Sequence, residues 1–375
     1  MEVNDFERRG YYGGRTEVFD YRFWEQPVYE DINSSYPSIM LNKPVPHPDK
    51  WAIIKQNWDS IRESEGISVV RVDVPKMDIP PLPYRTQAGK LLFPYGTWIA
   101  AYTHPELRMA EKYGVKIKEV LKTIVYEHTF NPFEEYIRSF HTLKNSSAGL
   151  NRNFYKLLLN SLSGKFGEMR EETIRINVKT SKMCECGKSS GLTCSKCGGY
   201  NLYDVQINSI EGDWISITGG RLPDPKHSFP VIIAYIAAYG RIKLYEERLS
   251  KVKTPIYCDT DCCVCEESSG FNTGPELGQW EPEEIYDFQA YAPKFYNCSG
   301  KMKLKGVPKK HRMVSEPKQL KFYYEKPLKL AEAIHQKEKP NLWKEVEKIV
   351  TFEDSKRRKT KSGTSYPVKI NETFL

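Results

Sequence analysis

The stretch Ile256–Val264 constrains the fold most, because two short runs of β-prone residues meet there at a pair of aspartates, Asp259 and Asp261. A hairpin of this kind ends both strands at one edge of a sheet and places the acids at its tip. Carboxylates held so close repel each other unless a cation lies between them, and Mg²⁺ prefers a few carboxylates together with phosphates. The stretch therefore predicts an antiparallel sheet carrying a divalent-metal site, with a plain exposed turn as the alternative.

A third carboxylate ends another β-prone run, Val28–Ile32, which is followed by a helix start. Ser34 or Ser35 can cap that helix, and Pro37 suits its first turn. Asp31 would then lie at the carboxyl end of a strand, beside backbone N–H groups that favour phosphate or metal binding. A solvated aspartate at a strand end is the alternative.

Residues 132–166 have the apolar spacing of helices, with a break at 144–149. In the second helix Lys156 and Asn160 are four residues apart and share one face. Such a face could hold a triphosphate and a base, and ordinary surface polarity would explain it equally well.

The segments between these motifs are less specific. Prolines occur in bursts within residues 42–130, between strand-like pieces such as 67–74 and 91–93 and before a helix near 105–113, which predicts an inserted subdomain. A helix predicted at 227–249 is apolar around most of its circumference and is expected to pack behind the aspartate hairpin.

Three short elements combine cations with aromatic residues or glycines: Tyr11–Arg15, Lys294–Tyr296 and Lys303–Gly306. A Gly-Gly pair allows close backbone approach, and Arg and Tyr suit a phosphate and a base. An ordinary turn is the alternative for the first element. Lysines that alternate with apolar residues put cations on one side of a strand, as a surface that follows a nucleic-acid backbone requires.

Four cysteines form a compact cluster: Cys184, Cys186, Cys194 and Cys197. Two tight pairs of thiols backed by glycines predict a tetrahedral Zn²⁺ site rather than free or paired thiols. Four thiolate ligands leave no open position, so the zinc would be structural. The Cys-x-Cys spacing of the first pair is tighter than in common zinc ribbons.

Charge and composition fit a protein with a nucleic-acid partner. The net charge is +8, and residues 301–361 contain nineteen Lys and Arg but eight Asp and Glu, so the rest of the chain is slightly acidic. A solvated Lys-rich face is the alternative. The longest apolar run, about ten residues, is too short to cross a bilayer. The clustered cysteines favour a reducing compartment, so no membrane partner and a cytoplasmic location are expected.

In their order along the chain, these elements resemble the motifs of family B DNA polymerases, especially the protein-primed branch. Motif A, Asp-x-x-Ser-Leu-Tyr-Pro-Ser-Ile, is matched by Asp31–Ile39 with Ser35 in place of Leu. Motif B, Lys-x-x-x-Asn-Ser-x-Tyr-Gly, is matched by Lys156–Gly164 with Ser163 in place of Tyr. Motif C, Tyr-x-Asp-Thr-Asp-Ser, is matched by Tyr257–Cys262 with Cys in place of Ser. The Tyr-x-Gly-Gly, Lys-x-Tyr and Lys-x-Lys-Gly elements extend the resemblance over nearly the whole chain.

The resemblance implies roles for individual residues. Two Mg²⁺ ions, for which Mn²⁺ could substitute, would be held by Asp31, Asp261 and the carbonyl of Ile32, with Asp259 in a secondary catalytic role. The implied nucleotide contacts are Ile32, Tyr36, Lys144, Lys156 and Asn160. The implied DNA contacts are Tyr12, Gly13, Gly14, Arg15, Lys294, Tyr296, Lys303 and Lys305. Tyr36 would stack under the sugar and exclude a 2′-hydroxyl, whereas the missing motif B ring at Ser163 leaves sugar and base-pair discrimination open.

The implied fold is α+β, a right-hand polymerase with an antiparallel-sheet palm, helical fingers, a small thumb and a zinc-ribbon-like insertion. The expected segments are palm at 1–41, an inserted subdomain resembling the terminal-protein region at 42–130, fingers at 131–167, the four-cysteine insertion at 168–210, palm at 211–298 and a basic thumb at 299–375. The insertion falls where the branch wraps its template, a role that the zinc ribbon would take.

The implied function is template-directed DNA synthesis from a primer 3′-hydroxyl. The expected partners are a DNA template-primer and deoxynucleotides, with a terminal protein or a separate exonuclease subunit as candidates. The family's proofreading domain precedes the Tyr-x-Gly-Gly element, where this sequence has ten residues, so no 3′–5′ exonuclease activity is expected. A primase-like polymerase that starts without a nucleic-acid primer and a non-catalytic replication protein are the alternatives. The cytoplasm would be that of a host if the protein is viral or plasmid-borne.

Overall fold

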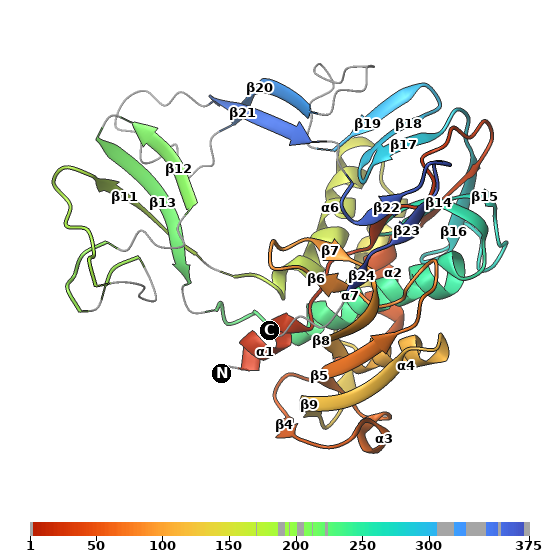
Figure 1. Cartoon of the computed structure of the whole chain (residues 1–375), viewed down its shortest axis with the longest axis horizontal. Coiled ribbons are helices and arrows are strands. Elements are labelled where there is room, and N and C mark those ends of the chain that lie inside the picture. The colour runs from red at the N-terminus through yellow and green to blue at the C-terminus, as the bar shows by residue number, and fades with distance from the viewer. Residues whose placement is uncertain are drawn as a thin grey trace.

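The computed structural model describes residues 3–169, 171–186, 192–194, 196–200, 206–211, 213–221, 224–305, 319–327, 343–351 and 354–370. The first of two five-stranded sheets is antiparallel and has the order β1-β14-β15-β2-β16. Figure 1 shows β14, β15 and β16 at the right of the molecule. The strands are β1 (Thr16–Val18), β14 (Lys253–Asp259), β15 (Cys262–Glu267), β2 (Val28–Ile32) and β16 (Trp280–Glu284). The aspartate hairpin is therefore confirmed, with Asp259 opposite Cys262 across a two-residue tip.

A second five-stranded sheet has the order β24-β8-β5-β9-β4, antiparallel except for the β24–β8 pair. Its strands are β24 (Lys369–Ile370), β8 (Tyr95–Thr103), β5 (Glu65–Val74), β9 (Lys116–Tyr126) and β4 (Trp51–Ile54). The predicted subdomain at 42–130 supplies four of these strands, and the predicted helix near 105–113 is α4 (His104–Lys112).

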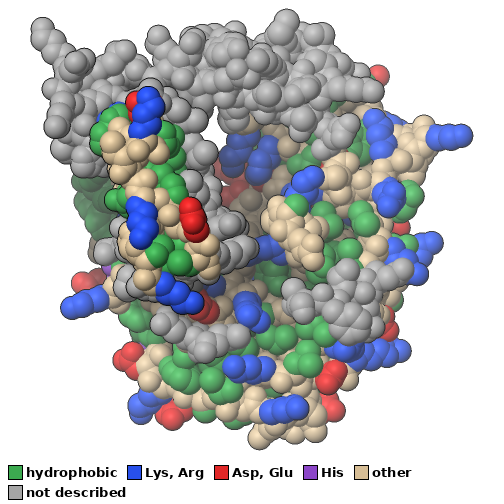
Figure 2. Space-filling view, turned by 60° about the vertical axis from the view of Figure 1, so that its left-hand side comes forward, with side chains coloured by type: hydrophobic (Ala, Val, Ile, Leu, Met, Phe, Trp, Pro, Cys, Tyr) green, Lys and Arg blue, Asp and Glu red, His purple; other side chains and the backbone are tan. Residues whose placement is uncertain are grey.

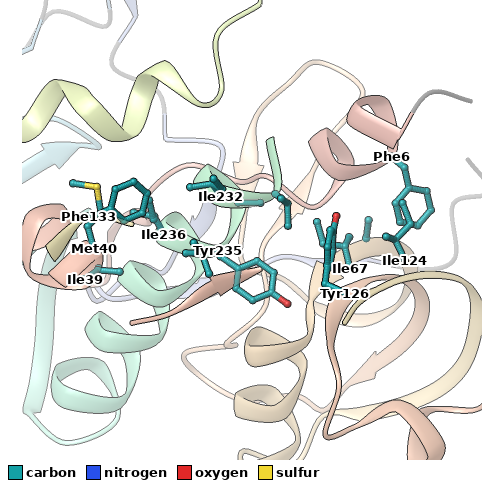
Figure 3. Close-up of a cluster of buried hydrophobic side chains, with 14 of the residues drawn as sticks. Phe6, Ile39, Met40, Ile67, Ile124, Tyr126, Phe133, Ile232, Tyr235 and Ile236 are labelled. Atoms are coloured by element: carbon teal, nitrogen blue, oxygen red, sulfur yellow. The ribbon is translucent and has the colours of Figure 1, made fainter. Parts of the chain in front are cut away.

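The helix predicted at 227–249 is α7 (Pro230–Leu244), continued by the π-helix η1 (Tyr245–Leu249). Twelve of the fifteen residues of α7 are buried, so nearly its whole circumference is in contact with protein. In Figure 3, Ile232 and Ile236 lie toward Met40 and Phe133, while the Tyr235 ring points toward the opposite group of side chains. This helix contributes to the cores of both sheets, because Tyr235 and its neighbours belong to a cluster with Ile67 and Ile124 of the second sheet, while Leu244 belongs to a cluster with Cys258 and Cys263 of the first.

The other helices flank this core. They are α1 (Val3–Arg9), α2 (Ser35–Asn42), α3 (Trp58–Ile61), α5 (Glu134–Asn145) and α6 (Gly149–Lys165). The last two match the helices predicted within 132–166, including the break between them. None of the helices in the described parts of the chain combines the length and the apolar character needed to cross a membrane.

A three-stranded sheet projects to the left in Figure 1: β11 (Glu171–Asn177), β13 (Trp214–Arg221) and β12 (Gln206–Glu211). Residues 214–221 were predicted to belong to the palm, but β13 pairs along its length with β11. The predicted insertion therefore extends to at least residue 221, since backbone pairing and not composition sets its end.

Several smaller sheets complete the described chain. They are β17 (Gln289–Ala292), β18 (Phe295–Cys298) and β19 (Lys301–Leu304); β20 (Gln319–Pro327) with β21 (Trp343–Thr351); β22 (Arg357–Lys359) with β23 (Ser365–Pro367); β3 (Val45–Pro46) with β10 (Thr129–Phe130); and β6 (Tyr84–Arg85) with β7 (Leu91–Leu92).

The C-terminal segment 354–370 corrects the prediction of a single thumb lobe at 299–375. The buried Arg357 guanidinium lies 3.7 Å from the Glu17 carboxylate and donates to the Asp78 carbonyl at 2.8 Å, and β24 pairs with β8. This segment is therefore held against the palm and the second sheet by buried polar contacts. Residues 306–318 and 328–342, which belong to the predicted thumb, lie outside the described residues.

Candidate active site

Asp31 and Asp261 meet at one edge of the palm sheet although they lie 230 positions apart in the sequence. Asp31 is paired in the sheet register with Cys262, the residue that follows Asp261. The Ile32 N–H donates a hydrogen bond to the Asp261 carbonyl at 2.9 Å, which ties the end of β2 to the hairpin tip. Both carboxylates line a polar cleft of about 510 Å³. Sheet register thus brings the two predicted metal ligands together.

The electrostatics of this pair favour a bound cation. Burial, followed by repulsion from Asp261, raises the pKa of Asp31 to about 7. Burial, with repulsion from Asp259, also raises the pKa of Asp261. A cation between the carboxylates would remove the repulsion that raises both pKa values. The Asp31 side chain is still open to water from the cleft, so an ion can enter.

Glu281 is a further cleft carboxylate that the sequence patterns did not reveal. It lies opposite Asp31 in the register of β16 and adds to the rise in the Asp31 pKa. No local motif marks it, because its place in the cleft depends on β16 pairing with β2.

Asp259 differs from the expected arrangement, since it is not among the residues that line the cleft. Its Oδ1 accepts a hydrogen bond from Thr16 Oγ1 at 2.8 Å and pairs with the Lys294 ammonium. Lys294 was predicted to contact primer DNA, but in this structure it neutralises Asp259. The pair holds the end of β14 to the start of β18, because opposite charges at this distance attract each other.

Cations from α5 and α6 form another wall of the same cleft. Lys144 from α5 and Lys156 and Asn160 from α6 all line it, together with Arg152 and Asn153. Lys144 is buried, and its Nζ donates to Ser34 Oγ at 3.2 Å. Burial, followed by repulsion from Arg152 and Lys156, lowers the Lys144 pKa. The wall therefore carries positive charge that an anion would stabilise.

Arg152 could have been found from the sequence. It lies four residues before Lys156, which lies four before Asn160, so all three share one face of α6.

Tyr36 lies in the same cleft at the start of α2, half-buried against α7. A Cβ on Gly240 of α7 would come within 3.3 Å of the Tyr36 ring, so glycine permits this close packing.

The predicted capping of α2 is wrong in detail: Ser34 has a φ of 53° and its side chain makes no capping bond. Its hydroxyl accepts from Lys144 instead, which leaves the first turn of α2 facing the cleft.

Ser163, which replaces the motif B tyrosine, is buried and is not among the residues that line the cleft. Its small size therefore does not widen the cleft.

The element Tyr11–Arg15 corrects a predicted template contact. The Arg15 side chain is 2% exposed, and its Nε donates to Glu17 at 2.7 Å while Nη1 donates to the Pro80 carbonyl at 2.8 Å. Tyr12 is also buried, stacked on Tyr102. Neither side chain can reach DNA from this position, because both are enclosed by protein.

Lys303 and Lys305 fit the predicted DNA contacts better, since both side chains are exposed at the end of β19. Tyr296 of β18 is half-buried, with its ring centroid 5.2 Å from that of Tyr257. The face of the molecule drawn in Figure 2 has a hollow with Lys and Arg side chains beside it in blue and carboxylates deeper inside it in red.

The four cysteines Cys184, Cys186, Cys194 and Cys197 converge, with their Sγ atoms within 4.8 Å of one another. Backbone N–H groups, chiefly that of Cys197, lower the Cys194 pKa to about 6, which favours the thiolate. In the described parts of the chain this is the only group of three or more His, Cys, Asp or Glu side chains close enough to share one ion.

The fold is also found in a solved structure. The structure superposes on that of Phi29 DNA polymerase complexed with primer-template DNA and incoming nucleotide substrates with a TM-score of 0.64 and 17% sequence identity, covering 94% of this chain and 63% of that one. The expected α+β fold with antiparallel sheets is confirmed.

Residues 1–197 match the family described as DNA polymerase type B, organellar and viral, so the chain belongs to this family. Similar proteins include a probable DNA polymerase of Agaricus bitorquis, 27% identical over 327 residues that cover 78% of this chain and 40% of the relative. The DNA-directed DNA polymerase of Enterobacteria phage PRD1 is 27% identical over 296 residues, 76% of this chain and 48% of the relative. The chain thus spans less than half the length of these two relatives.

Proposed function

We propose that the chain is a template-directed DNA polymerase that transfers deoxynucleotides to a primer 3′-hydroxyl. The observation that carries the proposal is the convergence of Asp31 and Asp261 in one cleft that Lys144, Arg152 and Lys156 also line. The carboxylates suit metal ions, and the cations suit a triphosphate.

Asp31, Asp261 and the Ile32 carbonyl would hold two Mg²⁺ ions, because hard cations prefer oxygen ligands. Bound there, the ions would supply charge stabilisation to the attacking and leaving oxygens of an in-line displacement. The primer 3′-oxygen attacks the α-phosphorus, its proton leaves, and the bond to pyrophosphate breaks.

The remaining cleft residues would bind and orient the nucleotide. Lys144, Arg152 and Lys156 neutralise the triphosphate, while Asn160 lies along the same helix. Tyr36 is packed firmly enough to act as a platform under the sugar. Lys303 and Lys305 would contact the backbone of the primer-template duplex.

Primer extension tests the proposal against its two alternatives. We expect the wild-type protein to extend a DNA primer on a template with dNTPs and Mg²⁺ and to make no product without a primer. Product without a primer would support the primase-like alternative. DNA binding without any extension, with Mg²⁺ or Mn²⁺, would support the non-catalytic one.

We also propose that residues 1–375 do not degrade DNA from the 3′ end. The carboxylates that meet in the described cleft, Asp31, Asp261 and Glu281, are already assigned to nucleotide transfer. The same assay without dNTPs should leave a labelled single-stranded primer intact. Shortening that persists when Asp31 and Asp261 are replaced would reveal a separate nuclease site.

The thiol cluster fits a structural Zn²⁺, because the four sulfur ligands converge. We propose that this zinc-bearing segment helps to wrap the template. Deleting residues 182–200 should reduce strand displacement on nicked templates by about tenfold or more while short-gap filling changes little, since the cleft is untouched. Unchanged extension on both templates would contradict this role.

A terminal protein and a separate exonuclease subunit stay predicted partners. A binding assay of this chain with each of them would test the prediction. The cytoplasmic location also stays a prediction, because the family description covers organellar as well as viral polymerases.

A further inference from the structure

The tip of the aspartate hairpin is held by the segment 13–16, which no part of the proposed chemistry uses. The Thr260 N–H donates to the Arg15 carbonyl at 2.6 Å, and Thr16 Oγ1 donates to Asp259 at 2.8 Å. Thr260 lies between Asp259 and Asp261 and has a φ of 66°. A threonine in this left-handed region is strained and persists only where its surroundings fix it.

Gly14 supplies the space in which Thr260 packs. A Cβ on Gly14 would lie 2.5 Å from Thr260 Oγ1 and 2.8 Å from Thr260 Cβ, both closer than atoms can approach. A Cβ on the neighbouring Gly13 would meet nothing within 4 Å. Neither glycine has a positive φ, so alanine suits both backbones and only the contact with Thr260 distinguishes them.

The holding segment is itself anchored from two sides. The buried Arg15 side chain is bonded to Glu17 and to the Pro80 carbonyl. The buried Arg241 of α7 is paired with Glu106 at 2.7 Å and donates to the Gly13 carbonyl at 3.1 Å. Buried charged groups with several partners hold a backbone firmly, because moving them would leave charges unpaired.

We infer that Gly14 and the Arg15 carbonyl position the turn that presents Asp261, so that this element acts on the metal site. The inference deepens the proposed polymerase function and rests on it for its kinetic test. Metal binding provides a second test that does not require activity.

Gly14→Ala should push Thr260 aside and displace the turn that carries Asp261. A displacement of about 1 Å at a reacting centre can cost about 100-fold in rate, so we expect kcat to fall about 100-fold while the Kd for primer-template DNA changes less than about twofold. Glu267→Gln, an exposed acid at the far end of β15, is the control and should match the wild type in both. Mn²⁺ binding, followed by electron paramagnetic resonance, should be weaker for Gly14→Ala than for the wild type and the control, as it should be for Asp261→Asn, which lacks a metal ligand.

A second substitution that restores activity would distinguish a positioning role of Gly14 from misfolding of the Gly14→Ala variant. Thr260→Gly removes the side chain that a Gly14 Cβ would strike and tolerates the positive φ. The double variant Gly14→Ala/Thr260→Gly should therefore recover most of the kcat and of the Mn²⁺ affinity lost in Gly14→Ala. A loss confined to DNA binding in Gly14→Ala, or no rescue in a folded double variant, would overturn the inference. If the wild type shows no extension, the proposed function fails, and the Mn²⁺ measurements alone decide the positioning role.

Discussion

Replacing Asp261 by asparagine is expected to lower the rate of nucleotide incorporation by about 1,000-fold or more. The substitution preserves shape but removes a charged metal ligand, and metal ions stabilise the transferring phosphoryl group by several kcal/mol. Each 1.36 kcal/mol corresponds to about a tenfold change in rate. Single-nucleotide incorporation at saturating dNTP measures the loss. Glu267→Gln, an exposed acid at the far end of β15, serves as the control and should keep full activity.

The same variant should bind primer-template DNA with nearly unchanged affinity. Asp261 is proposed to bind metal, whereas Lys303 and Lys305 are proposed to contact the DNA backbone. In the wild type, metal binding should weaken as the pH falls below about 7. The pKa of Asp31 is raised to about 7 without metal, so protons compete with the ion below that pH. An Asp261→Asn rate within tenfold of the wild type would remove the basis for the two-metal proposal.

Glu30→Gln is expected to destabilise the fold by about 3–5 kcal/mol, because it leaves a buried guanidinium without its counter-ion. Arg248 Nε lies 2.8 Å from Glu30 Oε2, and both side chains are fully buried. Arg248 also lies over the Trp280 ring at 4.3 Å. Glu30 precedes Asp31 on β2, so this ion pair fixes the strand that carries a metal ligand. Urea unfolding followed by circular dichroism measures the change.

Two controls test this reasoning. Asp59→Asn removes an exposed partner of Arg62 and should cost less than about 1 kcal/mol. The double variant Glu30→Met/Arg248→Met should be more stable than Glu30→Gln, because well-packed apolar groups can replace a buried ion pair. A loss for Glu30→Gln no larger than that for Asp59→Asn would show that the buried pair is not needed.

Local sequence patterns predicted the elements that carry the site. The hairpin tip, the strand ending at Asp31 and the face of α6 bearing Lys156 each follow from short-range rules: turn residues between β-prone runs, a strand followed by a helix start, and a period of 3.6 residues. These rules depend on neighbours along the chain, so they hold before the fold is known.

The same patterns misjudged residues whose role depends on distant partners. The sequence predicted that Arg15 contacts DNA, but its buried guanidinium donates hydrogen bonds to Glu17 and to the Pro80 carbonyl. Lys294 looked like a DNA contact, but its partner is Asp259. A charged side chain has the same local signature whether it faces solvent or pairs inside the protein, so sequence alone could not distinguish the two states.

The sequence by itself determined the hairpin, the fingers helices and the inventory of carboxylates, cations and thiols, because these depend on residue type and local periodicity. Only the tertiary structure decided that Asp31 faces Asp261, that Glu281 joins them and that Gly14 holds the turn between Asp259 and Asp261. The physical reason is that strand register and close packing are set by contacts across the whole core, between residues far apart in the sequence.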